Sequence, residues 1–346
     1  MIEHAPRRYP REVLIALALL LPAALLLALS QGAFTFSIAE ALRALGGPGN
    51  TAQSGQAHTI ILQIRLPRAL LAAMVGAILG CSGAAMQGLF RNPLADPSLI
   101  GVTAGASLGA SLAIVSGSGA LAGYLGFTTV SLGAFLGGLL TVTLVYRLSQ
   151  TANGTSVATM LLAGIAVTAL AGSLGSLLES YADSDMLRRI SLWRMGGLDG
   201  ATGERAALAC AIGAVVLTAL PRFAPALNAL LLGESEARHL GIDVARVKWA
   251  LILLVAVGVG ASVALAGSIA FVGLVVPHIL RMLMGPDHRA LLPACALGGA
   301  GLLLLADTLA RTAVAPSELP VGIVTSLIGV PFFVSLLRRR HQYGMH

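Results

Sequence analysis

The chain has 346 residues, of which 56% are hydrophobic and only 11% charged, and its formal net charge is +7. A soluble domain usually carries about 25% charged residues, and a mean hydropathy of +0.86 is too high for one soluble core to hide. These values exclude an ordinary soluble protein and indicate a polytopic membrane protein. The apolar stretches are long and contain glycine and proline, which favours helices over the short alternating strands of a barrel.

About ten apolar stretches can serve as membrane spans, since a span needs roughly 20 apolar residues and fewer where protein shields it. They cover residues 13–31, 66–89, 98–116, 127–148, 157–178, 206–221, 248–268, 271–285, 290–309 and 322–337. The first follows several arginines, as a signal peptide would, but no cleavage site follows it and we expect it to be retained. The sequence therefore predicts an all-α membrane protein with one transmembrane domain over residues 1–346.

An even number of spans places both termini on the same side of the membrane. Most of the 22 lysines and arginines fall on that side, and the side richer in these residues is the cytoplasmic one. We therefore expect cytoplasmic termini and a cytoplasmic location for the charged region at about residues 227–249.

Glycines recur at intervals of four within several predicted spans. They are Gly76 and Gly80; Gly101, Gly105 and Gly109; and Gly133 and Gly137. Small residues at this spacing let helix backbones approach closely in lipid. The pattern leaves open whether these rows face helices of the same subunit or a second copy of the chain.

The stretch "LNALLLGESEARHLGIDVARVKW", Leu227–Trp249, is charged although its surroundings are apolar. It predicts a two-turn helix over Glu234–Leu240, with acids in the first turn and bases in the last, as the helix dipole favours. Gly233 suits the N-cap and Gly241 the C-terminal stop. Isolated helices shorter than about 12 residues are marginal in water, so this helix must pack on its own membrane domain or in a partner's groove.

The only lysine, Lys248, follows Val247 rather than a glycine. A phosphate-binding loop of the form G-x-x-x-x-G-K-[ST] is therefore absent, and the chain cannot bind ATP in that way. If transport is driven by ATP, the nucleotide and its magnesium belong to another polypeptide. No histidine, cysteine and carboxylate cluster has metal-ligand spacing, so no metal or other cofactor is expected in this chain.

Four segments together resemble one family. "LLLGESEARHLGI" resembles the coupling segment of FecCD-type permeases of bacterial ABC importers, which carry heme, cobalamin and ferric siderophores. "QIRLPRALLAAMVGAILGCSGAAMQGLFRNPLADPSLIGVTAGA" (Gln63–Ala106) is similar to the second and third spans of that family. "SVALAGSIAFVGLVVPHILR" (Ser262–Arg281) and "ADTLARTAVAPSELPVGIVTSLIGVPFF" (Ala306–Phe333) are similar to its C-terminal half. The resemblance runs from about residue 60 to the end of the chain.

The resemblance implies the type II ABC importer permease fold with ten spans in the bacterial inner membrane. It also implies a homodimer with the pathway on its two-fold axis, two cytoplasmic ATPase subunits and a periplasmic binding protein, with no enzyme activity and no nucleic-acid partner for the permease itself. By the same resemblance, ATPase movement reaches the membrane domain through the coupling residues Gly233, Glu234, Glu236, Arg238 and Leu240.

Further family positions match on both sides of the membrane. Arg65, Arg68 and Arg311 match arginines that meet acidic residues of the binding protein, a task that suits the two-pronged guanidinium group; alternatively, they reach lipid headgroups. Asn92, Leu94, Thr155 and Ser156 match the cytoplasmic gate. Helix capping by Asn92 and Ser156 is an equally plausible role.

The segment Glu179–Gly200 is expected on the periplasmic side as an outer gate. Its arginines, Arg188, Arg189 and Arg194, suit acidic cargo groups or pairing with the local carboxylates Glu179, Asp183 and Asp185. Asp307 stands four residues before Arg311, which is ion-pair spacing on one helix face. We expect structural roles for Asp307 and for His278.

The resulting hypothesis is the permease of an ATP-driven importer for heme, with cobalamin second and a ferric siderophore third. A different class, an ion-coupled secondary transporter, would prefer paired carboxylates near the middle of the membrane. Asp307 alone gives that class little support. A membrane enzyme would need a nucleophile with its base or a metal signature, and the sequence contains neither.

Overall fold

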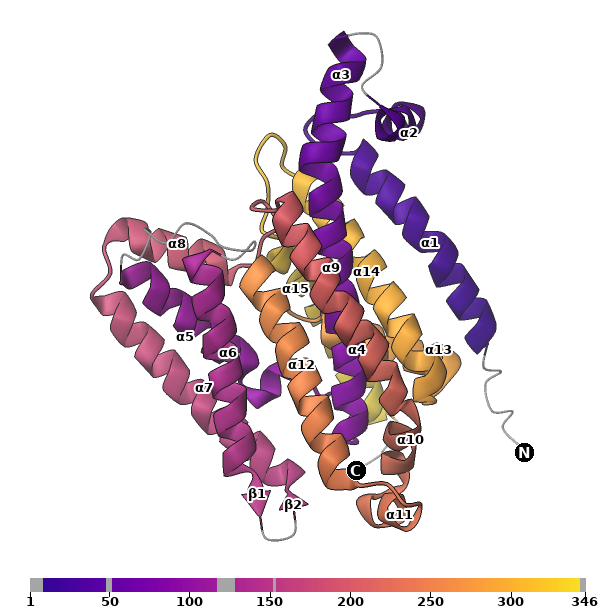
Figure 1. Cartoon of the computed structure of the whole chain (residues 1–346), viewed down its shortest axis with the longest axis vertical. Coiled ribbons are helices and arrows are strands. Elements are labelled where there is room, and N and C mark those ends of the chain that lie inside the picture. Colours follow the sequence, from indigo (N-terminus) through magenta and orange to yellow (C-terminus); the bar gives the residue numbers. More distant parts are fainter. Residues whose placement is uncertain (1–8, 48–51, 117–127, 152–153, 343–346) are drawn as a thin grey trace.

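Figure 1 shows the computed structural model of the chain. The structure describes residues 9–47, 52–116, 128–151 and 154–342. The elements are α1 Pro10–Ser30, α2 Ile38–Gly46, α3 Ala52–Thr59, the π-helix η1 Ile60–Arg65, α4 Leu66–Leu89, the 3₁₀ turn η2 Pro97–Ile100, α5 Val102–Val115, α6 Thr129–Leu148, β1 Gln150–Thr151, β2 Gly154–Thr155, α7 Val157–Ser180, α8 Ser184–Arg194, α9 Gly203–Ala219, the 3₁₀ turn η3 Leu220–Phe223, α10 Ala224–Leu232, α11 Glu234–His239, α12 Val244–Ala266, α13 Val272–Met284, α14 His288–Thr312 and α15 Val321–Gln342.

The predicted spans all coincide with helices. In the described part of the chain, 7 helices are long and apolar enough to cross a membrane. The shorter apolar helices Val102–Val115, Val272–Met284 and Val321–Ser335 occupy the remaining predicted spans. The prediction of an all-α polytopic membrane protein is confirmed. The span expected at 206–221 is longer than predicted, because α9 continues through η3 into α10 without a charged loop.

Helix α4 forms the centre of the bundle. Most of its side chains are buried, and Figure 1 shows it behind α9 and α12, with α14 beside it. Helices α5, α6 and α7 form a group on one side, and α1 lies on the opposite side. A helix that is apolar on all faces belongs in the interior, and the many alanines and glycines of α4 let its neighbours approach closely.

The glycine rows face neighbouring helices of the same subunit. A Cβ atom added at Gly76 or Gly80 would collide with backbone carbonyls of Gly299 and Cys295 in α14. In the same way, Gly109 of α5 lies directly against Gly133 of α6. Such close backbone approach is the usual role of small residues in membrane helices. The question that the sequence left open is therefore settled for these positions: the rows pack α4 on α14 and α5 on α6.

Candidate coupling and gating site

Helix α11 forms where the charged stretch predicts it. It covers Glu234–His239, Gly233 is its N-cap residue with φ 132°, and Leu240 is its C-cap. Gly241 follows with φ 81°, a conformation that glycine adopts without the steric cost of a side chain. The predicted helix and the positions of both glycines are confirmed.

One side chain of α11 is buried, and most of the others are exposed to solvent. Ala237 is fully buried against the membrane domain, whereas Glu236 and Arg238 are exposed and the side chain of Leu240 is 64% exposed. Figure 1 shows α11 at the lower end of the molecule, beside the start of α12 and at the same end as the β1–β2 hairpin. Charged groups and an apolar side chain therefore stand together on a surface that a partner can reach.

Lys248 in the second turn of α12 joins this helix to the hairpin. Its Nζ donates hydrogen bonds to Glu234 Oε1 at 2.6 Å and to the carbonyl oxygen of Thr155 at 2.7 Å. The lysine side chain is only 3% exposed, and these two acceptors offset the cost of removing an ammonium group from water. The other carboxylate oxygen of Glu234 lies 3.5 Å from Arg238. A cleft of about 330 Å³ lies between these groups.

This role of Lys248 was not predicted from the sequence, where the residue serves only to exclude a phosphate-binding loop. The available signal was a lone lysine at the start of a long apolar run, close in sequence to Glu234. Its second partner, Thr155, is 93 residues away, so no local pattern could have found it.

The predicted gate residues lie in two separate segments. Asn92 accepts a hydrogen bond from the backbone N–H of Leu94 at 2.9 Å and so closes a turn after α4. Thr155 is buried in β2, and Ser156 caps α7 by accepting from the N–H of Thr159 at 3.2 Å. The capping role of Ser156 is confirmed. For Asn92 it is wrong, because Asp96 caps the next helical turn, η2, instead. Among the described residues no hydrogen bond joins the two segments.

The three predicted docking arginines form a buried cluster at the end of the bundle where α4 begins. Arg65, Arg68 and Arg311 are 5%, 9% and 7% exposed. Asp307 accepts from Nη2 of Arg68 at 2.9 Å and from Nε of Arg311 at 3.1 Å. Arg68 also reaches Glu318 at 2.7 Å. The expected pairing of Asp307 with Arg311 is confirmed.

The remaining donors of this cluster are directed at the C-terminal end of α1. Arg65 donates to the carbonyls of Leu29 and Ser30, and Arg311 donates to Ala28 and Gln31. The last carbonyls of a helix have no partner within the helix and carry partial negative charge. In this conformation, little guanidinium surface is left for a partner's carboxylates. Docking of a binding protein by these arginines stays a prediction.

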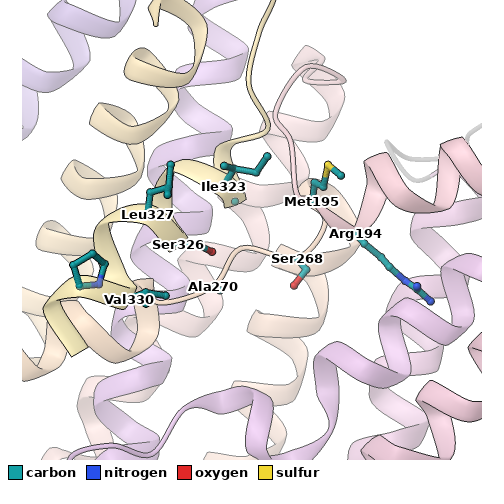
Figure 2. A pocket seen from close by; sticks show the side chains of 10 residues that line it. Arg194, Met195, Ser268, Ala270, Ile323, Ser326, Leu327 and Val330 are labelled. Carbon is teal, nitrogen blue, oxygen red and sulfur yellow. The ribbon is translucent and has the colours of Figure 1, made fainter. Parts of the chain in front are cut away.

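The segment Glu179–Gly200 contains the short helix α8, which Asp183 caps. Arg194 pairs with Glu179, as one of the two alternatives expected, and its Nε donates to Ser107 at 3.0 Å. Arg188 and Arg189 are exposed. Figure 2 shows Met195 and Ser268 opposite Ser326 and Leu327 of α15. These residues line a neighbouring cavity of about 530 Å³. Its lining is largely apolar, with Arg194 at one edge.

Asn228 of α10 stabilises the coupling end from another direction. Its Nδ2 donates to Asp287 at 2.6 Å, and Asp287 also accepts from the backbone N–H of Arg289 at 3.0 Å. These bonds, the backbone one first, hold the pKa of the Asp287 carboxyl below its ordinary value. The connection between α13 and α14 is thereby fixed to the helix that leads into α11. Within the described part of the chain, no group of three histidine, cysteine or acidic side chains could hold a metal ion.

The described structure is a bundle of membrane helices with a short charged helix at one end. Residues 19–339 match the model of the FecCD transport family, and the chain belongs to that family. FecCD proteins are permease subunits of ABC transporters and are not themselves enzymes. Such a subunit works with ATPase and binding-protein partners.

The chain is similar to several named permeases and to a solved structure. It is 47% identical over 295 residues to the hemin transport system permease protein HmuU of Yersinia pestis, covering 85% of this chain and 87% of that protein. It is 40% identical over 345 residues to the vitamin B12 import system permease protein BtuC of Klebsiella pneumoniae, covering 99% and 98%. A solved structure assigned to the metal-chelate type of ABC transporter, in an inward-facing conformation, matches with a TM-score of 0.84 and 35% identity, covering 96% of this chain and 100% of that one.

Proposed function

We propose that the chain is the permease of an ATP-driven bacterial importer and that two copies form the translocation pathway for heme delivered by a periplasmic binding protein. The observation that carries the proposal is helix α11. It exposes Glu236, Arg238 and Leu240 at one end of a membrane bundle. Its Glu234 accepts from Lys248 of α12, which also donates to Thr155 in the segment before α7. A partner that moves α11 therefore acts on the membrane domain directly.

Heme is favoured as cargo by the 47% identity to HmuU, which is named as a hemin permease. Cobalamin is the runner-up, because the relatives named for vitamin B12 import are 40–44% identical. A ferric siderophore is third. The cavity beside α8 and α15 is large and mostly apolar, which suits a bulky flat molecule with few charges. Arg194 lies at its edge, where Glu179 already compensates its charge.

The proposed arrangement puts α11 and both termini in the cytoplasm and the whole domain, residues 1–346, in the inner membrane. ATP and magnesium belong to the two partner ATPase subunits, and α11 and the exposed coupling residues meet them. Asn92, Leu94, Thr155 and Ser156 form the cytoplasmic gate around the pathway. The end that holds Arg65, Arg68 and Arg311 faces the binding protein, with Glu318 as the half-exposed member of the cluster.

An ion-coupled secondary transporter is disfavoured by the state of Asp307. That class needs a carboxylate free to gain and lose an ion near the middle of the membrane. Asp307 is instead shared between two arginines and almost fully buried. Its charge is compensated within the chain.

Co-purification of the ATPase with the permease tests the proposed class. Changing Glu236 and Arg238 together to alanine should strongly reduce the ATPase retained, while Arg222→Ala, on η3 and outside α11, should not. An ionophore that collapses the membrane potential or the proton gradient should leave uptake intact while ATP is supplied. Uptake that follows the proton gradient and continues without ATP would overturn the proposal in favour of the secondary transporter.

A further inference from the structure

Three structural elements meet at one ammonium group. Lys248 belongs to α12, Glu234 is the first residue of α11, and Thr155 ends the β1–β2 hairpin immediately before the cap of α7. The lysine bonds to both partners at 2.6 and 2.7 Å while its own side chain is buried. Breaking either contact leaves a buried charge with one partner fewer, which is costly.

Among the described residues, no direct hydrogen bond joins α11 to the β1–β2 hairpin. α11 spans only Glu234–His239 and has one fully buried side chain, Ala237. The hairpin pairs only Gln150 with Thr155 and Thr151 with Gly154. Elements this short keep their positions through tertiary contacts. A cleft of about 330 Å³ separates their surfaces, so the lysine bridges a gap that side-chain packing does not fill.

We propose that Lys248 is a positioning residue that couples α11 to the β1–β2 hairpin. Displacement of α11 then moves Thr155, a residue of the proposed cytoplasmic gate, and the start of α7. The inference rests on the proposed function, in which α11 receives the movement of an ATPase. The ammonium is a compact charge on a flexible stem with three donors. It can keep both oxygens within reach while the two elements shift together.

The test compares three variants in proteoliposomes that contain the permease and its co-expressed ATPase, with the binding protein outside. Lys248→Met keeps the apolar stem and removes the charge, and Lys248→Arg restores a cation with donors. Arg222→Met is the matched control, because it removes a cation that donates to a carbonyl, that of Thr218 at 2.6 Å, within its own helical segment. Hemin imported per ATP hydrolysed should fall at least about fivefold in Lys248→Met, the low end of usual coupling factors.

The same experiment predicts unchanged ATP hydrolysis and ATPase retention in Lys248→Met, because the lysine is buried and away from the exposed face of α11. Lys248→Arg should recover most of the ratio, and Arg222→Met should match the wild type. An unchanged ratio in Lys248→Met, an equal loss in Arg222→Met, or loss of the ATPase from the Lys248→Met complex would each overturn the proposal.

A second measurement does not depend on the cargo. Hydrogen–deuterium exchange of the peptide that contains the β1–β2 hairpin should change when ATP and vanadate are added to the wild-type complex, and this change should disappear in Lys248→Met. If the methionine variant fails to fold, Glu234→Gln on the half-exposed side of the contact should weaken the response. A response that persists in these variants, or is absent from the wild type, contradicts the link. Failure of every cargo in the wild type, with the exchange response present, contradicts only the transport proposal.

Discussion

The two ends of this bundle use the same chemical groups in different ways. At one end, Arg68 and Arg311 share Asp307, and further arginine donors are taken up by the C-terminal carbonyls of α1. At the other end, one ammonium group of Lys248 joins Glu234 to the carbonyl of Thr155. The three arginines are buried, and Arg68 and the half-exposed Glu318 border a cavity of about 460 Å³. The lysine junction borders a cleft of about 330 Å³ and adjoins the exposed face of α11.

From this contrast we infer that the arginine end stays fixed and that the end with α11 can move. A buried network with many satisfied partners fixes the helices that contribute to it, because losing one partner leaves a charge uncompensated. Segments with few buried contacts belong to the low-stability part of a protein, from which moving elements are drawn. We therefore expect substitutions in the arginine cluster to change stability, and substitutions around α11 to change coupling.

The largest effect is expected for Asp307→Asn. The change removes the carboxylate that compensates Arg68 and Arg311, and breaking a buried pair in this way costs about 3–5 kcal/mol of unfolding free energy. Thermal unfolding of the purified permease, followed by loss of the monodisperse chromatography peak, measures the effect. Arg246→Gln, which removes a well-exposed ion pair with Asp243, is the control and should have little effect. Equal stability of the two variants would contradict the contrast between the ends.

The next effect is expected at the interface of α4 and α14. Gly76→Ala places a methyl group against the Gly299 carbonyl, and such overpacking costs about 1–3 kcal/mol. Gly172→Ala in α7 is the matched control, since an added Cβ there meets nothing within 4 Å. That control should be neutral or stabilising by up to about 1 kcal/mol, because alanine is the better helix former. Similar losses from both changes would show that the glycine row does not hold these helices together.

A smaller effect on stability is expected for Arg238→Ala on α11. Its side chain is mostly exposed, and its ion pair with Glu234 has a long N–O distance of 3.5 Å. The free energy of unfolding should therefore change by no more than about 0.5 kcal/mol. ATPase retention, measured by pull-down from the same membranes, should nevertheless fall. If Arg238→Ala lost as much stability as Asp307→Asn, the end of the bundle with α11 would be as fixed as the end with Arg65, Arg68 and Arg311.

The smallest effect is the acid dependence contributed by Asp287. Its folded pKa is lowered from the ordinary value of 3.8, so its stabilising contribution is complete above that value and is lost as the pH falls through the lowered pKa. Melting curves from pH 7 to pH 3 should therefore steepen only below about pH 4. Asp287→Asn keeps an N-cap side chain and should remove this part of the slope. A melting temperature that rises on acidification in the wild type, and does not rise in the variant, would reverse the assigned sign.

The sequence predicted the helices well because their signals are local. The apolar spans, the two glycines around α11 and the spacing of Asp307 and Arg311 each lie within a few residues. The partners of Arg68 and Lys248 could not be predicted, because Asp307 is 239 residues from Arg68 and Thr155 is 93 residues from Lys248. For the same reason, the burial of the three arginines and the partners of the glycine rows required the three-dimensional structure.

The most direct test of the account is uptake of labelled hemin by proteoliposomes that contain this permease and its ATPase, with the binding protein outside and cobalamin in parallel vesicles. We expect hemin accumulation that requires both ATP and the binding protein, and much less accumulation of cobalamin. Accumulation of cobalamin or a ferric siderophore instead would contradict the assigned cargo. Transport that needs neither ATP nor the binding protein would contradict the importer itself.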